Sequence, residues 1–437
     1  MLPSIRSVFD RLGLDRPELR AWGMYDWANS PFMTSVVASV FPIYFSSVAA
    51  EQLPAAVATR RFALTSALAL VTLALCAPLL GALADRLAIR KRLLAAFLSL
   101  GAGTTACMFF VGRGDWLLAA ALFGLANIGA YGSFVFYDSL LPHVARRDEV
   151  DRVSTGGYAL GYLGGGLLLL VHLLWIRYPG TFGWADADTA ARAAFVSVAV
   201  WWLLFSLPLL RRVREPGPER RGEVAPLRDA WLQLGQTLRE LRRYRHAIVF
   251  LIAFLLYSDG IGTIIRLAAI YGMEIGIARD TLLAVILLVQ FVSVPFTFLF
   301  GRLALKIGAK AGIFLGLAVY VGICAFAYTI RSGSDFLVLA LLVGTVQGGT
   351  QALSRSLFAS LIPRSQSAQF FSFFAIMERF AGFIGPTLFV AVGAATGSNR
   401  NAILALIGLF VAGGLILAFV DVREGRRCAE ASDSAAD

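Results

Sequence analysis

The chain alternates between long apolar runs and short polar segments. A helix of about 20 residues crosses a hydrocarbon core of roughly 30 Å, and each run is long enough to do so. Backbone groups in lipid must be hydrogen-bonded within their own segment, so the pattern predicts helices. The runs are too long and too uniformly apolar for the strands of a barrel. The twelve predicted spans are 22–48, 60–83, 93–112, 116–142, 153–176, 190–210, 246–272, 281–303, 311–330, 335–362, 369–395 and 401–421.

The pattern repeats once along the chain. The charged segment Gly81–Arg92 follows the second run, and the segment 301–310 occupies the same place after the eighth run. The same offset of 220 residues places Asn127 on Gln347. A repeat of this length predicts two related halves of six helices each.

Composition excludes a soluble protein and charge sets the orientation. Hydrophobic residues make up 58% of the chain and charged residues 15%, with a mean hydropathy of +0.72. Polar side chains cannot cover that much apolar surface in water. The net charge is +11, but the basic residues occupy alternate loops and do not form one patch, which argues against nucleic acid as a partner. By the positive-inside rule both termini are expected in the cytoplasm.

Polar segments flank and join the two halves. The N-terminal segment carries a weak apolar stripe that predicts a short interfacial helix. The long linker contains an amphipathic pattern at 227–241, typical of a helix on the membrane surface. The polar tail is expected to lack regular structure. The predicted domains are a cytoplasmic segment 1–20, a six-helix bundle 21–210, a basic cytoplasmic linker 211–245, a second six-helix bundle 246–421 and a cytoplasmic tail 422–437.

The first span contains a proline that interrupts its hydrogen bonding. Pro31 lacks a backbone donor and clashes one turn back, which frees carbonyls near Asp26 to Ala28. Irregular backbone within a membrane is tolerated where it lines a cavity or is buried in protein. We therefore expect Tyr25, Asp26 and Asn29 at an opening.

Polar residues recur on one face of two later spans. Asn127, Tyr131 and Asp138 share a face of the fourth span at 100° per residue. Gln347 and Gln351 form the corresponding stripe on the tenth span. The two stripes predict surfaces related by the internal repeat.

The seventh span carries Asp259, Thr263 and Arg266 at spacings that place an acid and a base on one face. Ionisable groups in a span cost roughly 2.5 to 3.5 kcal/mol each on insertion scales, which suggests a use. One interpretation is a clamp for a small polar or zwitterionic solute, together with the two stripes. The alternative is an internal ion pair that braces helices.

The fifth span has glycines at four-residue spacing. Gly157, Gly161 and Gly165 form a small-residue face that permits close approach of another helix. This pattern predicts packing and not chemistry.

Several motifs resemble a known family. The two halves, the basic linker and the charged loops after the second and eighth spans resemble the major facilitator superfamily over about 20 to 425. Within it, four motifs are similar to the vacuolar amino-acid effluxer-like family. These are Tyr25–Ser30 with Phe41–Phe45, Phe136–His143, Gly157–Gly166 and Gln351–Phe358.

The resemblance implies a multi-pass secondary transporter, with spans 1, 4, 7 and 10 around a cavity that opens alternately to each side. For fungal relatives it suggests export of neutral amino acids from a vacuole. It also implies a closing contact between helix ends, made by Asp85, Arg86 and Arg90. Those three residues equally suit a loop whose charge only sets orientation. The chain departs from the family pattern at Ala88, at Leu305 and in the segment 374–379.

Two carboxylates are candidates for carrying a coupling proton. Burial favours the neutral form of an acid, so Asp26 or Asp138 could titrate near neutrality. The alternative is that Asp26 braces the broken first span and that Asp138 binds a loop arginine.

The sequence thus predicts an all-α membrane protein of twelve transmembrane helices in two six-helix bundles. We expect a transporter of a neutral amino acid or similar zwitterion by alternating access, coupled to protons, monomeric and in the inner membrane of a bacterium. Expected partners are the solute, protons and lipid, with no cofactor and no metal. A facilitator for sugars, organic anions or drugs is the alternative, ahead of a receptor. Motifs of membrane-embedded enzymes do not occur.

Overall fold

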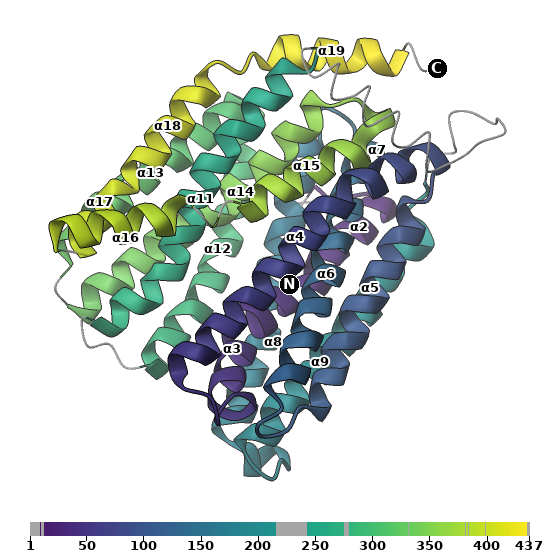
Figure 1. The fold of residues 1–437 in the computed structure, drawn as a ribbon. Helices are drawn as coiled ribbons and strands as arrows, with labels where there is room; N and C mark the ends of the chain where they lie inside the picture. The colour runs from purple at the N-terminus through teal and green to yellow at the C-terminus, as the bar shows by residue number, and fades with distance from the viewer. Residues whose placement is uncertain are drawn as a thin grey trace, which may run out of the picture.

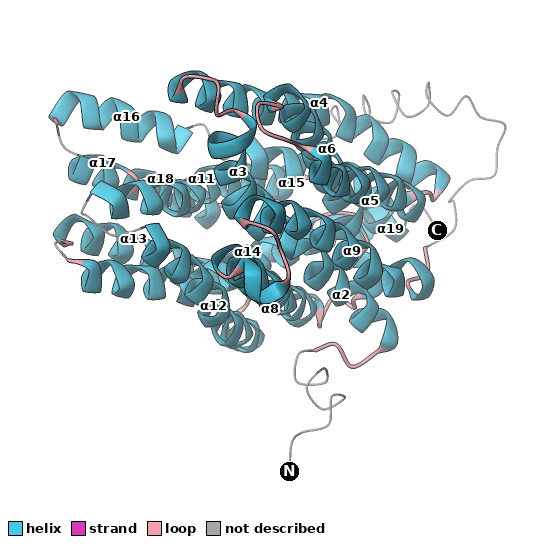
Figure 2. Cartoon of the chain, turned by 90° about the horizontal axis from the view of Figure 1, so that it is seen from below, coloured by secondary structure: helices cyan, strands magenta, loops and turns pink. Residues whose placement is uncertain are grey.

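The computed structural model of the chain describes residues 9, 13–215, 243–274, 279–330, 332–380, 382, 384–397 and 399–434. Every regular element in these residues is a helix (Figure 2). The N-terminal half comprises α2 (Pro17–Pro31), α3 (Val40–Tyr44), α4 (Ala55–Leu87), α5 (Arg90–Cys107), α6 (Trp116–Ser139), α7 (Leu141–Val144), α8 (Val150–Arg177) and α9 (Ala187–Arg212). The C-terminal half comprises α11 (Arg245–Glu274), α12 (Arg279–Ile307), α13 (Ala309–Thr329), α14 (Gly333–Leu361), α15 (Ser367–Phe380), α16 (Ile384–Thr396), α17 (Asn399–Ala405), α18 (Ile407–Ala418) and α19 (Val422–Ser434).

Eleven helical stretches in the described residues are long and apolar enough to cross a membrane. They correspond to the first ten predicted spans and the twelfth. The predicted eleventh span, 369–395, is divided between α15 and α16, and α16 alone is too short to be counted. Most helices extend a few residues beyond their apolar runs, because a helix continues into its polar flanks once the span has formed.

The first span is irregular downstream of Pro31. The chain leaves α2 through wide π-helical turns, η1 (Phe32–Ser39) and η2 (Phe45–Ala49), on either side of α3. The carbonyl of Trp27, one turn before Pro31, accepts a hydrogen bond of 3.1 Å from the indole N–H of Trp201. A carbonyl released by the proline is therefore satisfied by a neighbouring helix.

The predicted glycine face of the fifth span is confirmed as a packing surface. Gly157, Gly161 and Gly165 on α8 face the first span. A side chain at Gly157 or Gly161 would collide with that span, and one at Gly165 would make a tight contact with it. At Gly157 the nearest atom is a carboxylate oxygen of Asp26. This glycine therefore makes room for an acidic group inside the helix bundle.

The two halves lie side by side (Figure 1). They meet where α15 packs against α4 and α6, and where α8 packs against α12 and α14. We call the end of the molecule that carries the loop 88–89, α7, the start of α15 and α19 the terminal end. The opposite end, where α12 and α14 begin, is the far end.

The internal repeat extends to backbone conformation. Ala88, the residue after α4, has φ of +51°, and Gly308, the residue after α12, has φ of +83°. The two residues are related by the same offset of 220. A left-handed residue ends many helices, and glycine adopts this conformation at lower cost than alanine.

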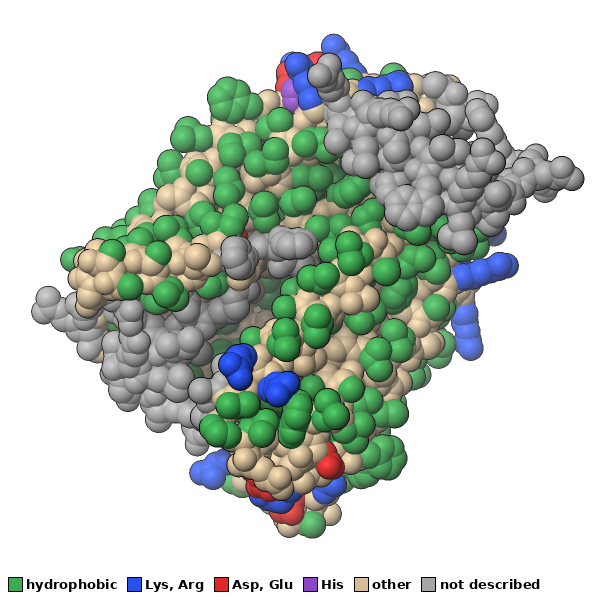
Figure 3. Space-filling view, viewed as in Figure 1, with side chains coloured by type: hydrophobic (Ala, Val, Ile, Leu, Met, Phe, Trp, Pro, Cys, Tyr) green, Lys and Arg blue, Asp and Glu red, His purple; other side chains and the backbone are tan. Residues whose placement is uncertain are grey.

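Hydrophobic side chains cover most of the visible face, and charged side chains gather mainly toward the two ends (Figure 3). This distribution is typical of a lipid-facing surface. The predicted interfacial helix near the N-terminus, apart from Phe9, and the amphipathic linker segment 227–241 lie outside the described residues.

The expectation for the tail is wrong, because residues 422–434 form the helix α19. The backbone N–H groups of Glu424 and Arg423 donate to the carboxylate of Asp421, which starts the helix and lowers the pKa of that carboxyl. Gly425 and Ala429 are buried against the rest of the protein. The polar composition of the tail concealed a helix that is held by contacts with other segments.

Candidate functional site

A cavity of about 410 Å³ lies between the two halves. Its lining extends from Arg355 and Asp138, near the terminal ends of their helices, to Leu282 and Phe336, near the far ends of α12 and α14. The cavity therefore lies between the centre of the protein and the far end. Polar and charged groups that line it are Asp26, Asn29, Ser30, Thr34, Tyr137, Asp138, Tyr158, Tyr162, Gln290, Gln347, Gln351, Arg355 and Glu378.

Arg355 on α14 occupies the terminal end of this cavity. Its side chain is 2% exposed. It lies one helical turn beyond Gln351 and two beyond Gln347, so the three side chains share a face. The sequence analysis did not select Arg355, although it lies in the motif Gln351–Phe358.

Two carboxylates of the N-terminal half hold the Arg355 guanidinium. One terminal nitrogen lies 3.0 Å from a carboxylate oxygen of Asp138 on α6, and the other lies 3.0 Å from an oxygen of Asp26 on α2. Charge-assisted pairs of this geometry are stronger than neutral hydrogen bonds. Asp26 and Asp138, which were predicted as separate proton carriers, therefore bind one cation contributed by the other half.

Ser154 on α8 completes the polar contacts of Arg355. Its hydroxyl accepts from the Nε of Arg355 at 3.0 Å and donates to the carbonyl of Ala352 at 2.8 Å. Its backbone carbonyl accepts from a terminal nitrogen at 3.1 Å. We call Arg355, Asp26, Asp138 and Ser154 the Arg355 cluster. All its members except Arg355 belong to the N-terminal half, so the cluster joins the halves.

Aromatic rings enclose the same guanidinium. Its central carbon lies 4.4 Å from the ring centre of Tyr158, 4.7 Å from that of Trp22 and 5.5 Å from that of Tyr137. Aromatic faces attract a cation, and arginine stacks on them well. These contacts lower the cost of burying the charge between the two halves of the protein.

Three other predicted residues also line the cavity. Asn29 lies on α2, and Gln347 and Gln351 lie on α14. The hydroxyl of Tyr162 donates to the side-chain oxygen of Gln351 at 3.1 Å, which adds a second polar contact between the halves. Sequence reasoning missed Tyr162 and Tyr158 because the glycines of their motif were interpreted only as packing.

Three predicted binding residues lie outside the cavity lining that the structure describes. Tyr25 is buried and packs against Tyr137 with ring centres 4.6 Å apart. The amide of Asn127 donates to the carbonyl of Phe123 one turn earlier at 2.8 Å, and Tyr131 packs against Phe134. The structure places these side chains in helix packing: Asn127 and Tyr131 contact residues of their own helix, and Tyr25 packs against a ring of α6.

Asp259 and Thr263 share a face, and that face meets the broken eleventh span. A carboxylate oxygen of Asp259 accepts from the backbone N–H of Gly385 at 2.6 Å, at the start of α16. The hydroxyl of Thr263 lies where a side chain at Gly385 would be. Both residues are fully buried and neither is among the described lining. The side chain of Arg266 lies outside the described residues.

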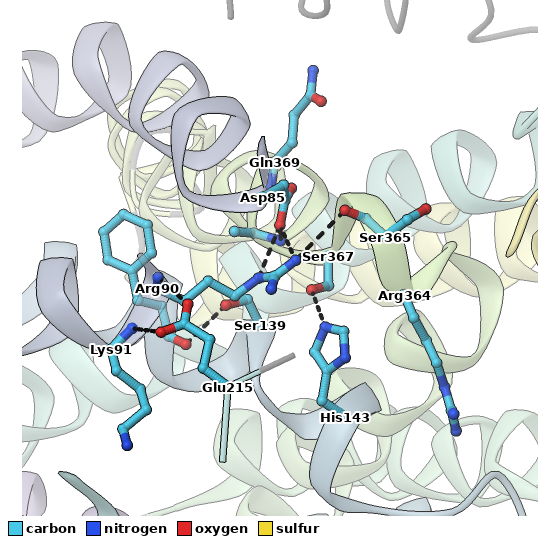
Figure 4. Close-up of polar contacts among 12 residues, drawn as sticks. Asp85, Arg90, Lys91, Ser139, His143, Glu215, Arg364, Ser365, Ser367 and Gln369 are labelled. Atoms are coloured by element: carbon cyan, nitrogen blue, oxygen red, sulfur yellow. Dashed lines mark hydrogen bonds and ion pairs between the residues drawn. The ribbon is translucent and has the colours of Figure 1, made fainter. Parts of the chain in front are cut away.

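Asp85 lies at the terminal end and binds the opposite half (Figure 4). Its carboxylate accepts from the backbone N–H groups of Ala368 and Gln369 at 2.9 and 2.8 Å, in the first turn of α15. A helix N-terminus attracts an anion through its free N–H groups and its dipole. Gly81, one turn earlier, lets the two backbones approach, because a side chain there would meet the carbonyl of Ala368.

Arg90 supports Asp85 from the same half. Its side chain is 3% exposed and forms an ion pair of 2.6 Å with Asp85. Its backbone N–H and that of Lys91 donate to Glu215, which follows α9. Arg86 is half-buried at the end of α4. The predicted charged segment Gly81–Arg92 is therefore mostly the last turns of one helix and the first turn of the next.

A second contact joins the halves beside Asp85. Nε2 of His143 lies 3.1 Å from the hydroxyl of Ser367, the first residue of α15 (Figure 4). The start of α15 is thus bound at three consecutive residues by groups of the N-terminal half. The structure closes the terminal end while the cavity lies on the other side of the Arg355 cluster.

Comparison with known proteins shows the family of the chain. The model of a family described as "Vacuole effluxer Atg22 like" matches residues 52–430. The chain belongs to this Atg22-like family. An uncharacterised MFS-type transporter of Bacillus subtilis, YxiO, is 36% identical over 408 residues, which cover 92% of this chain and 94% of that protein.

A fungal member is more distant. Autophagy-related protein 22 of Yarrowia lipolytica is 27% identical over 309 residues, which cover 64% of this chain and 52% of the fungal protein. The matched part is therefore about half of the length of that relative. The fold resembles that of the proton:xylose symporter XylE, with a TM-score of 0.66, 16% identity and coverage of 95% and 96% of the two chains.

These findings confirm the predicted fold and class. This member of the Atg22-like family is a multi-pass membrane protein with the major facilitator fold and a transporter, and its family and structural neighbours are transporters and not enzymes.

Proposed function

We propose that the chain is a proton-coupled secondary transporter of a small zwitterion, a neutral amino acid or a close analogue. The observation that carries this proposal is the Arg355 cluster, in which one buried cation of the C-terminal half binds two carboxylates of the N-terminal half at the end of the cavity. A zwitterion offers both charges. Its carboxylate can take the place of one acid on Arg355 while its ammonium group binds the acid released.

The cluster also explains how binding and movement could be linked. The cavity can open at the terminal end only if the halves separate there, and Arg355 must then leave Asp26, Asp138 and Ser154. Protonation of one carboxylate weakens its pair with Arg355, and a bound zwitterion satisfies the groups that part. A ligand shifts such an equilibrium by its difference in affinity for the two states.

Other predicted residues have supporting roles in this proposal. Asn29, Gln347 and Gln351 give neutral hydrogen-bonding groups along the cavity, which suits the uncharged part of a polar solute. Arg266 stays a proposed binding residue of the seventh span. We further propose an inner-membrane location in a bacterium with both termini in the cytoplasm, supported by the basic loops of the terminal end.

A thermal-stability screen tests the solute class. Purified protein in detergent is heated with amino acids, sugars, organic acids or cationic drugs. A bound solute raises the melting temperature, because it adds about 2.7 kcal/mol to the free energy of unfolding when its concentration is roughly 100 times its Kd. We expect a neutral amino acid to stabilise the protein and Gln347→Leu to reduce that effect. The exposed variant Gln52→Leu should keep it. Stabilisation by sugars or drugs alone would contradict the zwitterion assignment.

Asp138→Asn tests the coupling. In liposomes, one coupled proton should let a gradient of one pH unit drive about tenfold accumulation of the solute, because one pH unit corresponds to about 1.4 kcal/mol. We expect the variant to lose accumulation and to keep solute exchange between the two sides, since exchange needs no net proton movement. Asp26→Asn is the matched variant on the other carboxylate. Full pH-driven accumulation in both variants would remove these residues from the proton path.

A further inference from the structure

Helix α19 lies across the terminal end (Figure 1). Several polar contacts bind it to the C-terminal half. The carboxylate of Glu424 lies 2.8 Å from the guanidinium of Arg245 and 2.9 Å from Nε2 of His246, both at the start of α11. The hydroxyl of Tyr244 donates to that of Ser432 at 3.1 Å. These contacts fix both ends of α19 on its own half.

The last turns of α19 also contact the opposite half. Arg147 follows α7 in the N-terminal half, and its two terminal nitrogens lie 3.0 Å from a carboxylate oxygen of Glu430 and 3.4 Å from one of Asp433. The side chain of Arg147 is 32% exposed and that of Asp433 21% exposed, so both charges are partly removed from water. Dissolved ions therefore screen the pair of Arg147 and Asp433 less than they would screen a fully exposed ion pair.

Asp433 has partners in a third segment as well. The second oxygen of its carboxylate accepts from the backbone N–H groups of Arg364 and Ser365 at 2.8 and 3.4 Å. These residues open the short turn η6 (Arg364–Gln366), which leads directly into the start of α15. The same start of α15 is the segment that binds Asp85 and His143. One carboxylate thus connects α19, the N-terminal half and the turn that positions the closing contact.

We propose that α19 is a second closing element of the terminal end, in which Asp433 holds Arg147 and the turn before α15, and that Arg147 must leave α19 before the cavity can open at this end. The contact between Arg147 and α19 exists only while the halves are together at the terminal end. It therefore stabilises that conformation over the one open at this end, whichever solute is carried. The proposal does not depend on the zwitterion assignment.

The test measures the distance between the halves directly. Nitroxide labels are placed at Asp148→Cys in the N-terminal half and at Lys306→Cys in the C-terminal half, both exposed at the terminal end. The four native cysteines are replaced by alanine first. Pulsed electron paramagnetic resonance in nanodiscs then gives the fractions of short and long distances. For Asp433→Asn we expect the ratio of long to short distances to rise about two- to fivefold, since the variant weakens one partly exposed ion pair between the halves.

Glu424→Gln is the matched control, because it removes a charge from the same helix but only from a contact within the C-terminal half. It should leave the distance distribution unchanged. Arg147→Gln approaches the same contact from the other half and should reproduce the shift of Asp433→Asn, which keeps the test decisive if one variant fails to fold. Unchanged distributions in both variants would overturn the proposal, and so would an equal shift in Glu424→Gln.

Discussion

Replacing Arg355 with glutamine is expected to abolish transport and to destabilise the protein. The variant leaves Asp26 and Asp138 facing each other at the end of the cavity without their cation. Removing one partner of a buried ion pair typically costs about 3 to 5 kcal/mol, because the remaining charge is uncompensated. In this case the substitution destabilises the conformation in which the two halves are in contact at the cluster.

Uptake into liposomes and thermal unfolding of the purified variant measure the two effects. Arg355→Lys is the informative comparison, because it keeps the charge and loses the planar fork that reaches both carboxylates. We expect it to recover stability in part and transport very little. Arg302→Gln, which removes an exposed arginine of α12, should change neither. A fully active Arg355→Gln variant would remove the cluster from the transport cycle.

The second large effect is expected for Asp85→Ala. This variant removes the acceptor for two N–H groups of α15 and leaves Arg90 buried without its carboxylate. A charge at a helix terminus contributes up to about 2 kcal/mol in a partly buried geometry, so the loss should change the balance of the two conformations by about tenfold or more. We expect slower turnover with retained solute binding, because Asp85 lies outside the described cavity lining.

Turnover in liposomes and solute-dependent thermal stabilisation separate these two properties. Glu215→Gln is the control for the Asp85 variant, since Glu215 binds the backbone of Arg90 and Lys91 within its own half. We expect it to leave turnover near that of the unchanged protein. Unchanged turnover in Asp85→Ala would show that this segment only sets the orientation of the chain in the membrane.

The fold was accessible from the sequence because lipid restricts the possible structures. Apolar runs of sufficient length must be helices, and the repeat that relates the segment Gly81–Arg92 to 301–310 predicts two related halves. The division of the eleventh span into α15 and α16 was not predicted. Glu378 and Arg379 are the charged residues within that run. The acceptor for the start of α16 is Asp259, more than one hundred residues earlier in the chain, so the pattern of the run alone does not reveal it.

The candidate site was accessible only in part. Asp26 and Asp138 were selected as candidate proton carriers and both line the cavity, but their common partner was not found. The residue related to Arg355 by the repeat is Val135, which is apolar. Matching polar stripes between the halves therefore did not reveal Arg355. A lone arginine in a span, one turn beyond Gln351, was the signal available. Conversely, Asn127 and Tyr131 do share a face of the fourth span, but periodicity does not predict whether that face lines a cavity or packs against protein.

The closing contact of the terminal end is not repeated in the other half. The residue related to Asp85 by the repeat is Leu305, which is 57% exposed, and the residue related to Arg90 is Lys310, which donates to carbonyls of Ala418 and Val420 at the end of α18. The symmetry of the two bundles is therefore broken at a contact that holds one particular conformation. We expect an empty carrier to rest with its cavity toward the far end, and its reorientation toward the terminal end to be the slow step of each cycle. Loading the carrier from one side would then be faster than loading it from the other, even without any gradient.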